Sequence, residues 1–389
     1  MQTGRRFLLA VVGLAAALLA GCGGGDDTPP KVPISRVVVA GDSLADAGTF
    51  GARFTVQNSA NPAAGFPVFP QIVAQAFGVD SQCNFFVFTG TTFAPNPRTG
   101  CTNFAIGGGR VVNPVADGGA ASPQSIPRQL AVAAQAVGGT YAASDLVLVD
   151  GGGNDAADLV RAFLGAASGP AGVAAYQAFL AQQLSPETIA ATLPQPNGAA
   201  IAAGLYMQEI ANTYYDAVKL NALDKGATHV AVLDVPDITL TPLFRAVLAQ
   251  VAQANGGGTA GATAAATLQA TIRQWINGSN TQLRARVAGD VRVAVIPFNA
   301  DFTDEVSHPV EFALSDVTRP ACAVVGVVDF GEQSPAGCTS AALDANPPAG
   351  LAPGWWQSWT FSDGFHPTPF GHRLLAASTN RALARAGWL

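Results

Sequence analysis

Four short apolar runs, spaced between longer helical stretches, constrain the fold of this chain more than any other feature. The runs cover residues 36–40, 145–150, 229–233 and 291–296. They are nearly free of polar residues, which is typical of strands that are buried on both faces. The stretches with helical periodicity cover residues 69–77, 126–137, 203–225, 264–287 and 371–386. Strands that alternate with helices predict a mostly parallel sheet covered by helices on both faces.

The composition fits one large globular body. Of the 389 residues, 49% are hydrophobic and 12% are charged, which allows a large core and excludes a disordered chain. The formal net charge is -6, and no Lys/Arg cluster follows the first residues, so we expect no nucleic-acid partner. No linker divides residues 36–389, which we expect to form one domain. Residues 250–270, rich in Ala, Gly and Thr, are predicted to form a surface insertion.

The N-terminus has the pattern of an export signal. Arg5 and Arg6 precede an apolar stretch over 7–20, which is too short to span a bilayer comfortably. The stretch ends in Leu-Ala-Gly-Cys at 19–22, which resembles the lipobox of bacterial lipoproteins. An ordinary secretory signal with a chance cysteine is the alternative.

This resemblance implies that residues 1–21 are a signal peptide and that Cys22 is lipidated. Residues 22–35 would then form a flexible tether to a membrane. Gly23 follows the cysteine in place of Asp. By resemblance to lipoprotein sorting, this favours the outer membrane of a bacterial cell envelope.

Four further cysteines remain: Cys83, Cys101, Cys322 and Cys338. An even number in an exported chain indicates two disulfides, with three possible connectivities. Proximity in sequence favours Cys83–Cys101 and Cys322–Cys338, and four free buried thiols are the alternative. No CxxC or HxxxH pair is present, which argues against a zinc site.

Ser43 is the candidate nucleophile. It follows the first predicted strand, after Gly41, and we expect a helix to begin next to it. A nucleophilic serine needs a base, a group that orients the base and donors for the developing oxyanion. A serine that only caps a helix is the alternative.

His366 is the candidate base. His366 lies three residues after Asp363, so the carboxylate can reach the imidazole and fix its tautomer. His372 falls within a predicted helix and is expected to be structural. The same expectation holds for His229, which opens a strand, and for His308.

Two candidate oxyanion donors follow glycine-rich segments. Asn154 offers a side-chain amide after three glycines, and Gly108 offers a backbone N–H that another group can approach closely. The common alternative GxSxG motif is not met, because Ala45 stands at its last position. No phosphate-binding GxxxxGK[ST] motif is present.

Four segments together resemble the GDSL family of lipases and esterases, also called SGNH hydrolases. They are Gly-Asp-Ser-Leu-Ala-Asp-Ala-Gly at 41–48, Asn-Phe-Ala-Ile-Gly-Gly at 103–108, Gly-Gly-Asn-Asp at 152–155 and Asp-Gly-Phe-His-Pro at 363–367. The resemblance implies a Ser43–His366–Asp363 triad. It implies an oxyanion hole formed by the N–H of Ser43, the N–H of Gly108 and the amide of Asn154.

The resemblance covers about residues 36–389 and implies a flavodoxin-like three-layer α/β/α sandwich without a metal or organic cofactor. One departure is Gly109, where larger family members usually carry Ala. The implied activity is a carboxylesterase or lipase that acts on an ester or lipid through an acyl-enzyme. We expect it to act as a monomer.

Two alternatives share the same residues. An acyltransferase or a carbohydrate O-deacetylase would use the same triad with a different acceptor or leaving group. A non-catalytic lipoprotein that binds an envelope partner is the other alternative. Trp355, Trp356 and Trp359 precede the last segment, and they either line a substrate site or pack under the loop.

Overall fold

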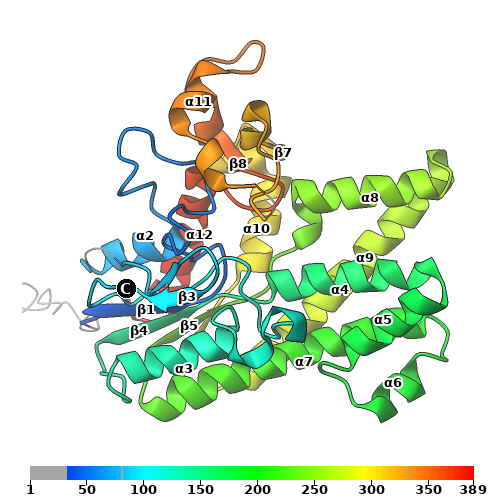
Figure 1. The fold of residues 1–389 in the computed structure, drawn as a ribbon, viewed down its shortest axis with the longest axis horizontal. Helices are drawn as coiled ribbons and strands as arrows, with labels where there is room; N and C mark the ends of the chain where they lie inside the picture. Colours follow the sequence, from blue (N-terminus) through cyan, green and yellow to red (C-terminus); the bar gives the residue numbers. More distant parts are fainter. Residues whose placement is uncertain (1–32, 80–81, 332) are drawn as a thin grey trace, which may run out of the picture. The chain divides into compact units, whose positions relative to one another are not determined.

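A parallel sheet forms the centre of the fold (Figure 1). The computed structural model describes residues 33–79, 82–331 and 333–389, so the predicted signal peptide and Cys22 lie outside the described residues. The sheet has the order β1 (Arg36–Ala40), β4 (Asp145–Val149), β5 (Val230–Leu233) and β6 (Val293–Ile296), with every neighbouring pair parallel. A parallel bridge from Val39 to Asn103 adds a short segment on the other side of β1. This order is the flavodoxin-like one and confirms the predicted fold class.

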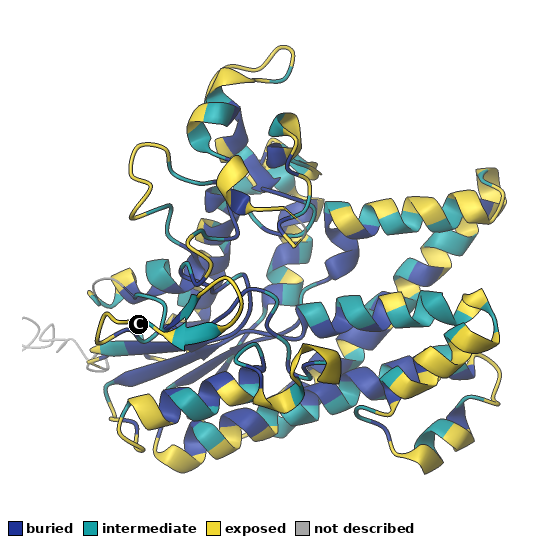
Figure 2. Cartoon of the chain, in the orientation of Figure 1, coloured by how far each residue is buried: buried dark blue, intermediate teal, exposed yellow. Residues whose placement is uncertain are grey.

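β4 and β5 are buried along their whole length, as their apolar sequences predict, whereas residues of β6 alternate between half-buried and buried (Figure 2). These three strands are shorter than expected. Asp150 and His229 fall outside β4 and β5, and β6 begins at Val293. Val291 is 89% exposed, so it lies in the turn before β6 although it is apolar.

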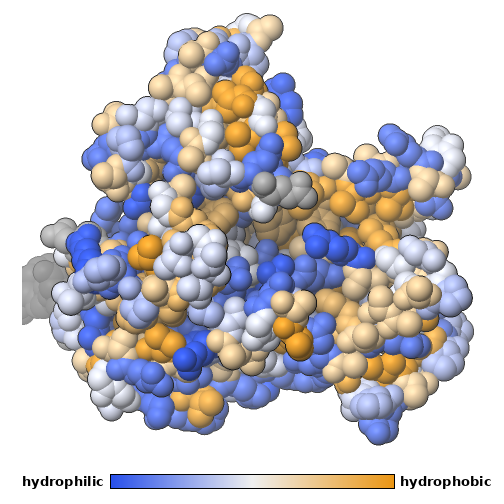
Figure 3. Space-filling model, viewed as in Figure 1, coloured by the Kyte–Doolittle hydropathy of each residue, from blue (hydrophilic) through white to orange (hydrophobic). Residues whose placement is uncertain are grey.

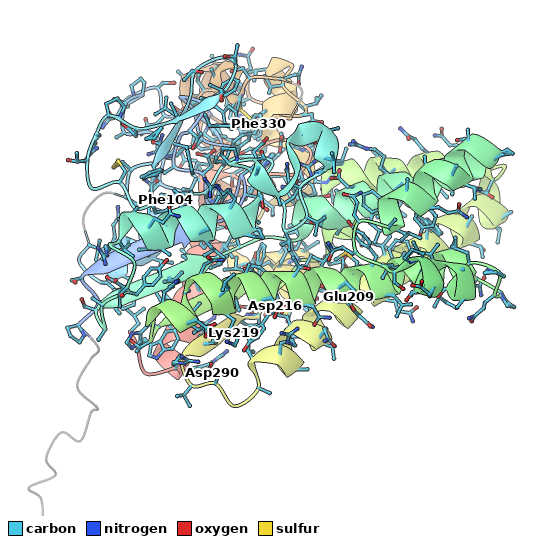
Figure 4. All side chains as sticks on the ribbon, turned by 60° about the horizontal axis from the view of Figure 1, so that its bottom comes forward. Phe104, Glu209, Asp216, Lys219, Asp290 and Phe330 are labelled. Carbon is cyan, nitrogen blue, oxygen red and sulfur yellow. A yellow bond between two sulfur atoms is a disulfide. The ribbon has the colours of Figure 1, made fainter. Side chains whose placement is uncertain are left out.

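Helices cover both faces of the sheet (Figure 1). One layer contains α3 (Ile126–Ala136), α7 (Gly198–Asn221) and α9 (Gly258–Val287). The other contains α2 (Phe69–Ala76), α10 (Phe298–Ser307) and α12 (Pro369–Arg385). Figure 4 shows Asp216 and Lys219 along α7, on the side that faces away from the sheet.

The remaining elements are shorter or extend from the layers. The helices are α4 (Gly153–Gly165), α5 (Pro170–Leu180), α6 (Pro186–Thr192), α8 (Pro242–Ala254) and α11 (Ser340–Ala345). The strands are β2 (Phe86–Phe88) and β3 (Phe93–Pro95), which pair antiparallel, and β7 (Asp316–Pro320) and β8 (Trp359–Phe361), which pair parallel. The 3-10 helices are 115–117, 119–121, 166–168, 223–225, 238–240, 309–312, 321–325, 335–337 and 355–358.

Residues 250–270, expected to form a surface insertion, are mostly exposed and mostly helical. These residues complete α8 and begin α9, and the turn between the two helices contains Gly256 and Gly257, both with positive φ. Alanine is the strongest helix former, so an Ala-rich segment with two glycines at one point forms a helical hairpin. Phe244 is the only fully buried residue of α8, and Figure 3 shows apolar surface beside this helix.

A second apolar cluster lies around the disulfide Cys322–Cys338. It contains Trp355, Trp356 and Trp359, all buried. The indole N–H of Trp355 donates to the carbonyl of Leu343, and that of Trp356 donates to the carboxylate of Asp344. The three tryptophans therefore pack under the loop, the second of the two alternatives.

The disulfides pair as sequence proximity predicts. Cys83 is bonded to Cys101 and Cys322 to Cys338. In the part of the chain that the structure describes, no helix is both long and apolar enough to cross a membrane.

Candidate active site

Ser43 lies in a tight turn at the carboxyl end of β1. The turn forms because the carbonyl of Asp42 accepts the N–H groups of Ala45 and Asp46. The prediction of a helix after Ser43 is wrong. The chain makes a single turn there, and Gly48 then takes a positive φ. Without a helix to cap, the N-cap role for Ser43 is wrong as well. Ser43 is only 3% exposed.

The side chains of Ser43, His366 and Asp363 form one chain of hydrogen bonds. The Nε2 atom of His366 lies 2.8 Å from the Oγ atom of Ser43. Its Nδ1 atom lies 2.9 and 3.0 Å from the two carboxylate oxygens of Asp363. This arrangement lets the imidazole accept the hydroxyl proton at Nε2 while Nδ1–H donates to the carboxylate.

Three backbone N–H groups hold the Asp363 carboxylate in place. Phe365 and His366 donate to Oδ1 over 2.9 and 2.6 Å, and Phe330 donates to Oδ2 over 2.7 Å. Phe330, labelled in Figure 4, comes from the segment between the two cysteines of the second disulfide. Donors from two separate segments therefore fix the orientation of this carboxylate.

Aromatic rings enclose the imidazole of His366. Phe54 lies 5.1 Å from it, and Phe330 stacks on it at 5.7 Å, both measured between ring centroids. Phe365 meets it edge-on at 5.9 Å. The ring is thus held in one plane and is largely shielded from water, with the residue 7% exposed.

Burial and charge act in opposite directions on this pair. Burial alone would lower the pKa of His366, but the charge of Asp363, its hydrogen bond and the charge of Asp42 raise that pKa above its ordinary value. Burial alone would raise the pKa of Asp363, but His366 and the backbone donors bring that pKa below its ordinary value. Asp363 therefore stays ionised, and it stabilises a protonated imidazole.

Each of the three predicted oxyanion donors retains an N–H hydrogen that no acceptor among the described residues takes. The backbone N–H groups of Ser43 and Gly108 donate to no acceptor among the described residues. Gly108 has a φ of 76°, which favours glycine. The side-chain amide of Asn154 donates one hydrogen to the carbonyl of Gly109 over 3.0 Å and retains the other. Asn154 lies in the first turn of α4, where the helix dipole also favours negative charge.

Side chains that the sequence analysis missed hold the loop that carries Gly108. Asp46 lies inside the first of the four sequence segments. Its carboxylate accepts the N–H groups of Gly48, Thr49 and Gly107 over 2.7–2.8 Å. These bonds tie the loop to the turn of Ser43.

Arg110 acts on the other side of the same loop. Its guanidinium donates to the carbonyl of Gly108 over 2.6 Å and pairs with Asp158 of α4 over 2.5 Å. Asp155 accepts the N–H groups of Val111 and Val112 over 3.0 and 2.8 Å. These bonds tie the residues that follow Gly108 to α4, the helix that carries Asn154, and the side-chain amide of Gln124 binds the carbonyl of Gly107, in the peptide that carries the Gly108 N–H.

Gly109 is required by the backbone around it. A Cβ atom at this position would lie 2.5 Å from the carbonyl oxygen of Gly41 and 3.0 Å from that of Ile106. Neither carbonyl can move without disturbing β1 or the Gly108 loop. The departure from Ala at this position therefore has a steric cause in this chain.

A buried pair of acids, also missed from sequence, lies behind Ser43. Asp150 follows β4, and its buried carboxyl group lies against that of Asp42. Burial, the charge of Asp42 and a hydrogen bond between the two carboxyl groups raise the pKa of Asp150 well above its ordinary value. One shared proton therefore satisfies the pair.

The other histidines lie away from this chain of hydrogen bonds. His372 is buried in α12, where its Nδ1 accepts the N–H of Phe69 over 3.3 Å, and burial lowers its pKa to about 3. His308 pairs with Asp304 on the surface, and His229 packs on Trp388. The structural roles expected for these three histidines fit their positions.

Comparison with known families yields one match. The model of a family described as GDSL-like lipase/acylhydrolase matches residues 37–379. The matched span contains all four of the sequence segments around the site. The comparison with curated proteins finds no match.

Proposed function

Because the chain belongs to the GDSL-like lipase/acylhydrolase family, we propose that it is a serine hydrolase of carboxylic esters with Ser43 as nucleophile. The observation that carries the proposal is the 2.8 Å contact between Ser43 Oγ and His366 Nε2, with Asp363 bonded to the far nitrogen of the ring. A serine hydroxyl becomes a strong nucleophile when a base this close removes its proton.

The reaction proceeds in two halves. His366 takes the hydroxyl proton as Ser43 Oγ attacks the ester carbonyl, and the resulting imidazolium is stabilised by Asp363. The tetrahedral intermediate collapses as His366 returns the proton to the leaving alcohol, which leaves an acyl group on Ser43. His366 then deprotonates a water molecule that attacks this acyl group, and the acid is released as Ser43 regains its proton.

The negative charge on the carbonyl oxygen is held by the N–H groups of Ser43, Gly108 and Asn154. Removal of one such donor typically costs about 3 kcal/mol of transition-state stabilisation. Asn154 is the donor that a substitution can remove. We expect Asn154→Ala to lower kcat about 100-fold or more with a much smaller rise in KM.

The central test combines turnover with covalent labelling. Wild-type protein should hydrolyse p-nitrophenyl esters and react with a fluorophosphonate at Ser43, as located by peptide mass spectrometry. Ser43→Ala should lose both. Retained turnover in Ser43→Ala would refute the assignment, and a wild-type protein that neither turns over esters nor labels would favour the envelope-binding alternative.

The acceptor of the acyl group defines the remaining alternatives. An acyltransferase or a carbohydrate O-deacetylase would use the same three side chains. Products formed from phospholipid, triglyceride and acetylated sugar, with and without an added alcohol, distinguish these reactions. Release of free acid as the main product from lipid esters is the result expected for a lipase or esterase.

We also propose that Cys22 is lipidated and tethers this enzyme to the outer membrane of a bacterial envelope. The support is the sequence at 19–23 alone, with Gly23 as the residue that favours the outer membrane. Cys22→Ala should move the protein from the membrane fraction to the soluble fraction, whereas an unchanged distribution would refute the anchor.

A further inference from the structure

One end of the described fold carries almost no charge. Residues 162–208 contain one charged side chain, that of Glu187, and residues 246–272 contain none, whereas 12% of the whole chain is charged. These stretches form the end of α4, all of α5 and α6, the beginning of α7 and the hairpin of α8 and α9. The elements contact one another and lie together at the right of Figure 1. We call this surface the charge-poor end.

A groove of about 940 Å³ lies in the charge-poor end. Residues of α7 and α9 form most of it, and residues of α4 and α8 complete it. Its lining includes the buried side chains of Leu268 and Trp275 and that of Ile201, which is 43% exposed. None of the described residues that line the groove is charged. Figure 3 shows apolar side chains on the side of the hairpin that faces α4.

The exposed face of α9 hides its own hydroxyl groups. Thr263, Thr267 and Thr271 follow one another at intervals of one turn, and each hydroxyl donates to the carbonyl four residues earlier over 2.8–2.9 Å. Thr267 and Thr271 also line the groove. Because these hydroxyls already have partners within the helix, a second surface can cover them without leaving a polar group unsatisfied.

The composition of the charge-poor end suits a protein partner better than a membrane. A membrane surface is bound through Lys and Arg together with large apolar side chains such as Trp, Phe and Leu. The exposed residues here are mainly Ala, Gly, Pro, Thr and Gln. By contrast, the buried centre of a protein–protein interface is depleted of charged residues.

The net charge of the chain favours a second copy as this partner. With a formal charge of -6 each, two copies repel one another over most of their surfaces, but at this end they can meet without burying an unpaired ion. Each copy carries both the hairpin and the groove beside it, so a two-fold axis lets each hairpin cover the groove of the other copy. A stable interface uses about 20–30 residues per partner, which the two stretches are long enough to supply.

From these observations we propose that the charge-poor end is a dimer interface, in which the α8–α9 hairpin of each copy fills the groove of the other. The dimer differs from the monomer that we expected from the sequence. It does not depend on the proposed ester hydrolysis, because the interface uses none of the residues assigned to the reaction.

The first test is the mass in solution of the mature chain with Cys22→Ala, which carries no lipid. Sedimentation velocity over a concentration series should show a dimer that dissociates on dilution. Added NaCl should not raise the dissociation constant, since no ion pair contributes to the interface. A protein that stays monomeric at every concentration would overturn the proposal.

The second test places charge in the groove. Ile201→Glu combined with Thr267→Glu should raise the dissociation constant at least about 100-fold, because each acid would be buried without a partner. Gln75→Glu combined with Gln135→Glu is the matched control, since it adds the same charge at exposed positions of α2 and α3. The control should change the dissociation constant less than about threefold. Equal weakening in both variants would mean that general repulsion, and not this surface, governs association.

A third measurement stays informative if the acidic variant does not fold. Cys83, Cys101, Cys322 and Cys338 are all in disulfides, so Thr267→Cys in the Cys22→Ala chain offers one free thiol. The rate of its alkylation by a maleimide should be at least tenfold lower in the dimer than in the diluted monomer. The thiol of Gln135→Cys should react at the same rate in both. A dimer that leaves Cys at position 267 unprotected would place the interface elsewhere and refute the proposal.

Discussion

Two regions at the same end of the sheet each bury an aspartate, and the protein treats the two carboxyl groups in opposite ways. In the segment from β8 to α12, Asp363 accepts three backbone N–H groups and the imidazole of His366. At the ends of β1 and β4, the carboxyl group of Asp150 faces a second acid, Asp42. Both side chains are almost completely buried.

The difference shows that burial alone does not decide the charge of a carboxyl group; its neighbours do. Burial disfavours both carboxylates, but the charge and hydrogen bond of His366, with the backbone donors, bring the pKa of Asp363 below its ordinary value. For Asp150, burial and a second acid together raise the pKa well above its ordinary value. One region therefore supplies a fixed negative charge to His366, and the other keeps a proton behind Ser43. The four predictions below test this contrast.

The largest expected effect is on catalysis. Asp363→Asn replaces the charge with an amide that favours the wrong tautomer of His366, so kcat should fall by about 10⁴-fold. Asp150→Asn keeps a neutral group that can donate to Asp42, so its kcat should fall less than about tenfold. Steady-state kinetics measure kcat of both variants, and circular dichroism checks that both are folded. Similar losses of kcat in the two variants would contradict the contrast.

The second effect is on stability, with opposite pH dependence. The raised pKa of Asp150 means that the folded state keeps a proton that the unfolded chain releases above pH 3.8. The free energy of unfolding therefore falls as pH rises from 3.8 toward the raised pKa of Asp150, by at most about 1.4 kcal/mol per pH unit. Asp150→Asn should remove this loss. The lowered pKa of Asp363 gives the reverse: its contribution is present above pH 3.8 and is lost as pH falls.

Urea unfolding between pH 4 and pH 8 measures this second effect. The free energy of unfolding of Asp150→Asn should exceed that of the wild type by an amount that grows with pH. Asp224→Asn, which changes an exposed carboxylate, serves as the control and should show no such growth. If the free energy of unfolding of Asp150→Asn varied with pH in parallel with that of the wild type, Asp150 would not be the group that holds the proton.

The third effect is steric. A Cβ atom at Gly41 would lie 1.5 Å from Oδ1 of Asp150, and Gly41 has no positive φ that would require glycine by itself. Gly41→Ala should therefore destabilise the fold by about 1–3 kcal/mol, and by much less in an Asp150→Ala background. A double-mutant cycle measured by urea unfolding gives the coupling energy between Gly41→Ala and Asp150→Ala. Additive losses of stability would mean that contact with Asp150 is not the reason why position 41 requires glycine.

The smallest effect concerns the donors of Asp363. The disulfide Cys322–Cys338 closes the segment that carries Phe330, which donates to Asp363 and stacks on His366. Replacement of both cysteines by Ala should lower kcat about tenfold, which corresponds to a rise of about 1.4 kcal/mol in the activation free energy. The same replacement should also reduce stability.

The matched control for this effect is the other disulfide. Replacing Cys83 and Cys101 by Ala should reduce stability and leave kcat nearly unchanged, since this pair holds no residue that contacts His366. Equal losses of kcat in the two double variants would show that preorganisation of Phe330 does not matter.

Much of the site is local enough to be predicted from the sequence. Asp363 and His366 are three residues apart, and the short segments around Ser43, Gly108 and Asn154 each end or follow a strand-like segment. The parallel sheet followed from the buried strand runs, because the carboxyl ends of parallel strands lie at the same edge. The helix predicted over 264–287 lies within α9, whereas α8 and the first residues of α9 were not predicted as helix, because glycines interrupt this alanine-rich segment.

The parts that could not be predicted depend on contacts between distant segments. Phe330 and Phe54 enclose His366 from segments with no motif of their own. Asp46 and Arg110 orient the Gly108 loop through hydrogen bonds whose partners are up to 61 residues away. Side chains of these types are common in loops, so nothing in their local sequence distinguishes them.

The sequence by itself determined the candidate groups: which hydroxyl, which imidazole, which carboxylate and which donors the chain offers. Tertiary structure decided how they meet. Ser43 and His366 are separated by 323 residues and come within 2.8 Å only because β1 and the segment before α12 end at the same edge. The parallel register that pairs Ala40 with Val149 brings Asp150 against Gly41 and Asp42. Register and layer packing are properties of the whole fold, and these properties made one buried aspartate an anion and the other an acid.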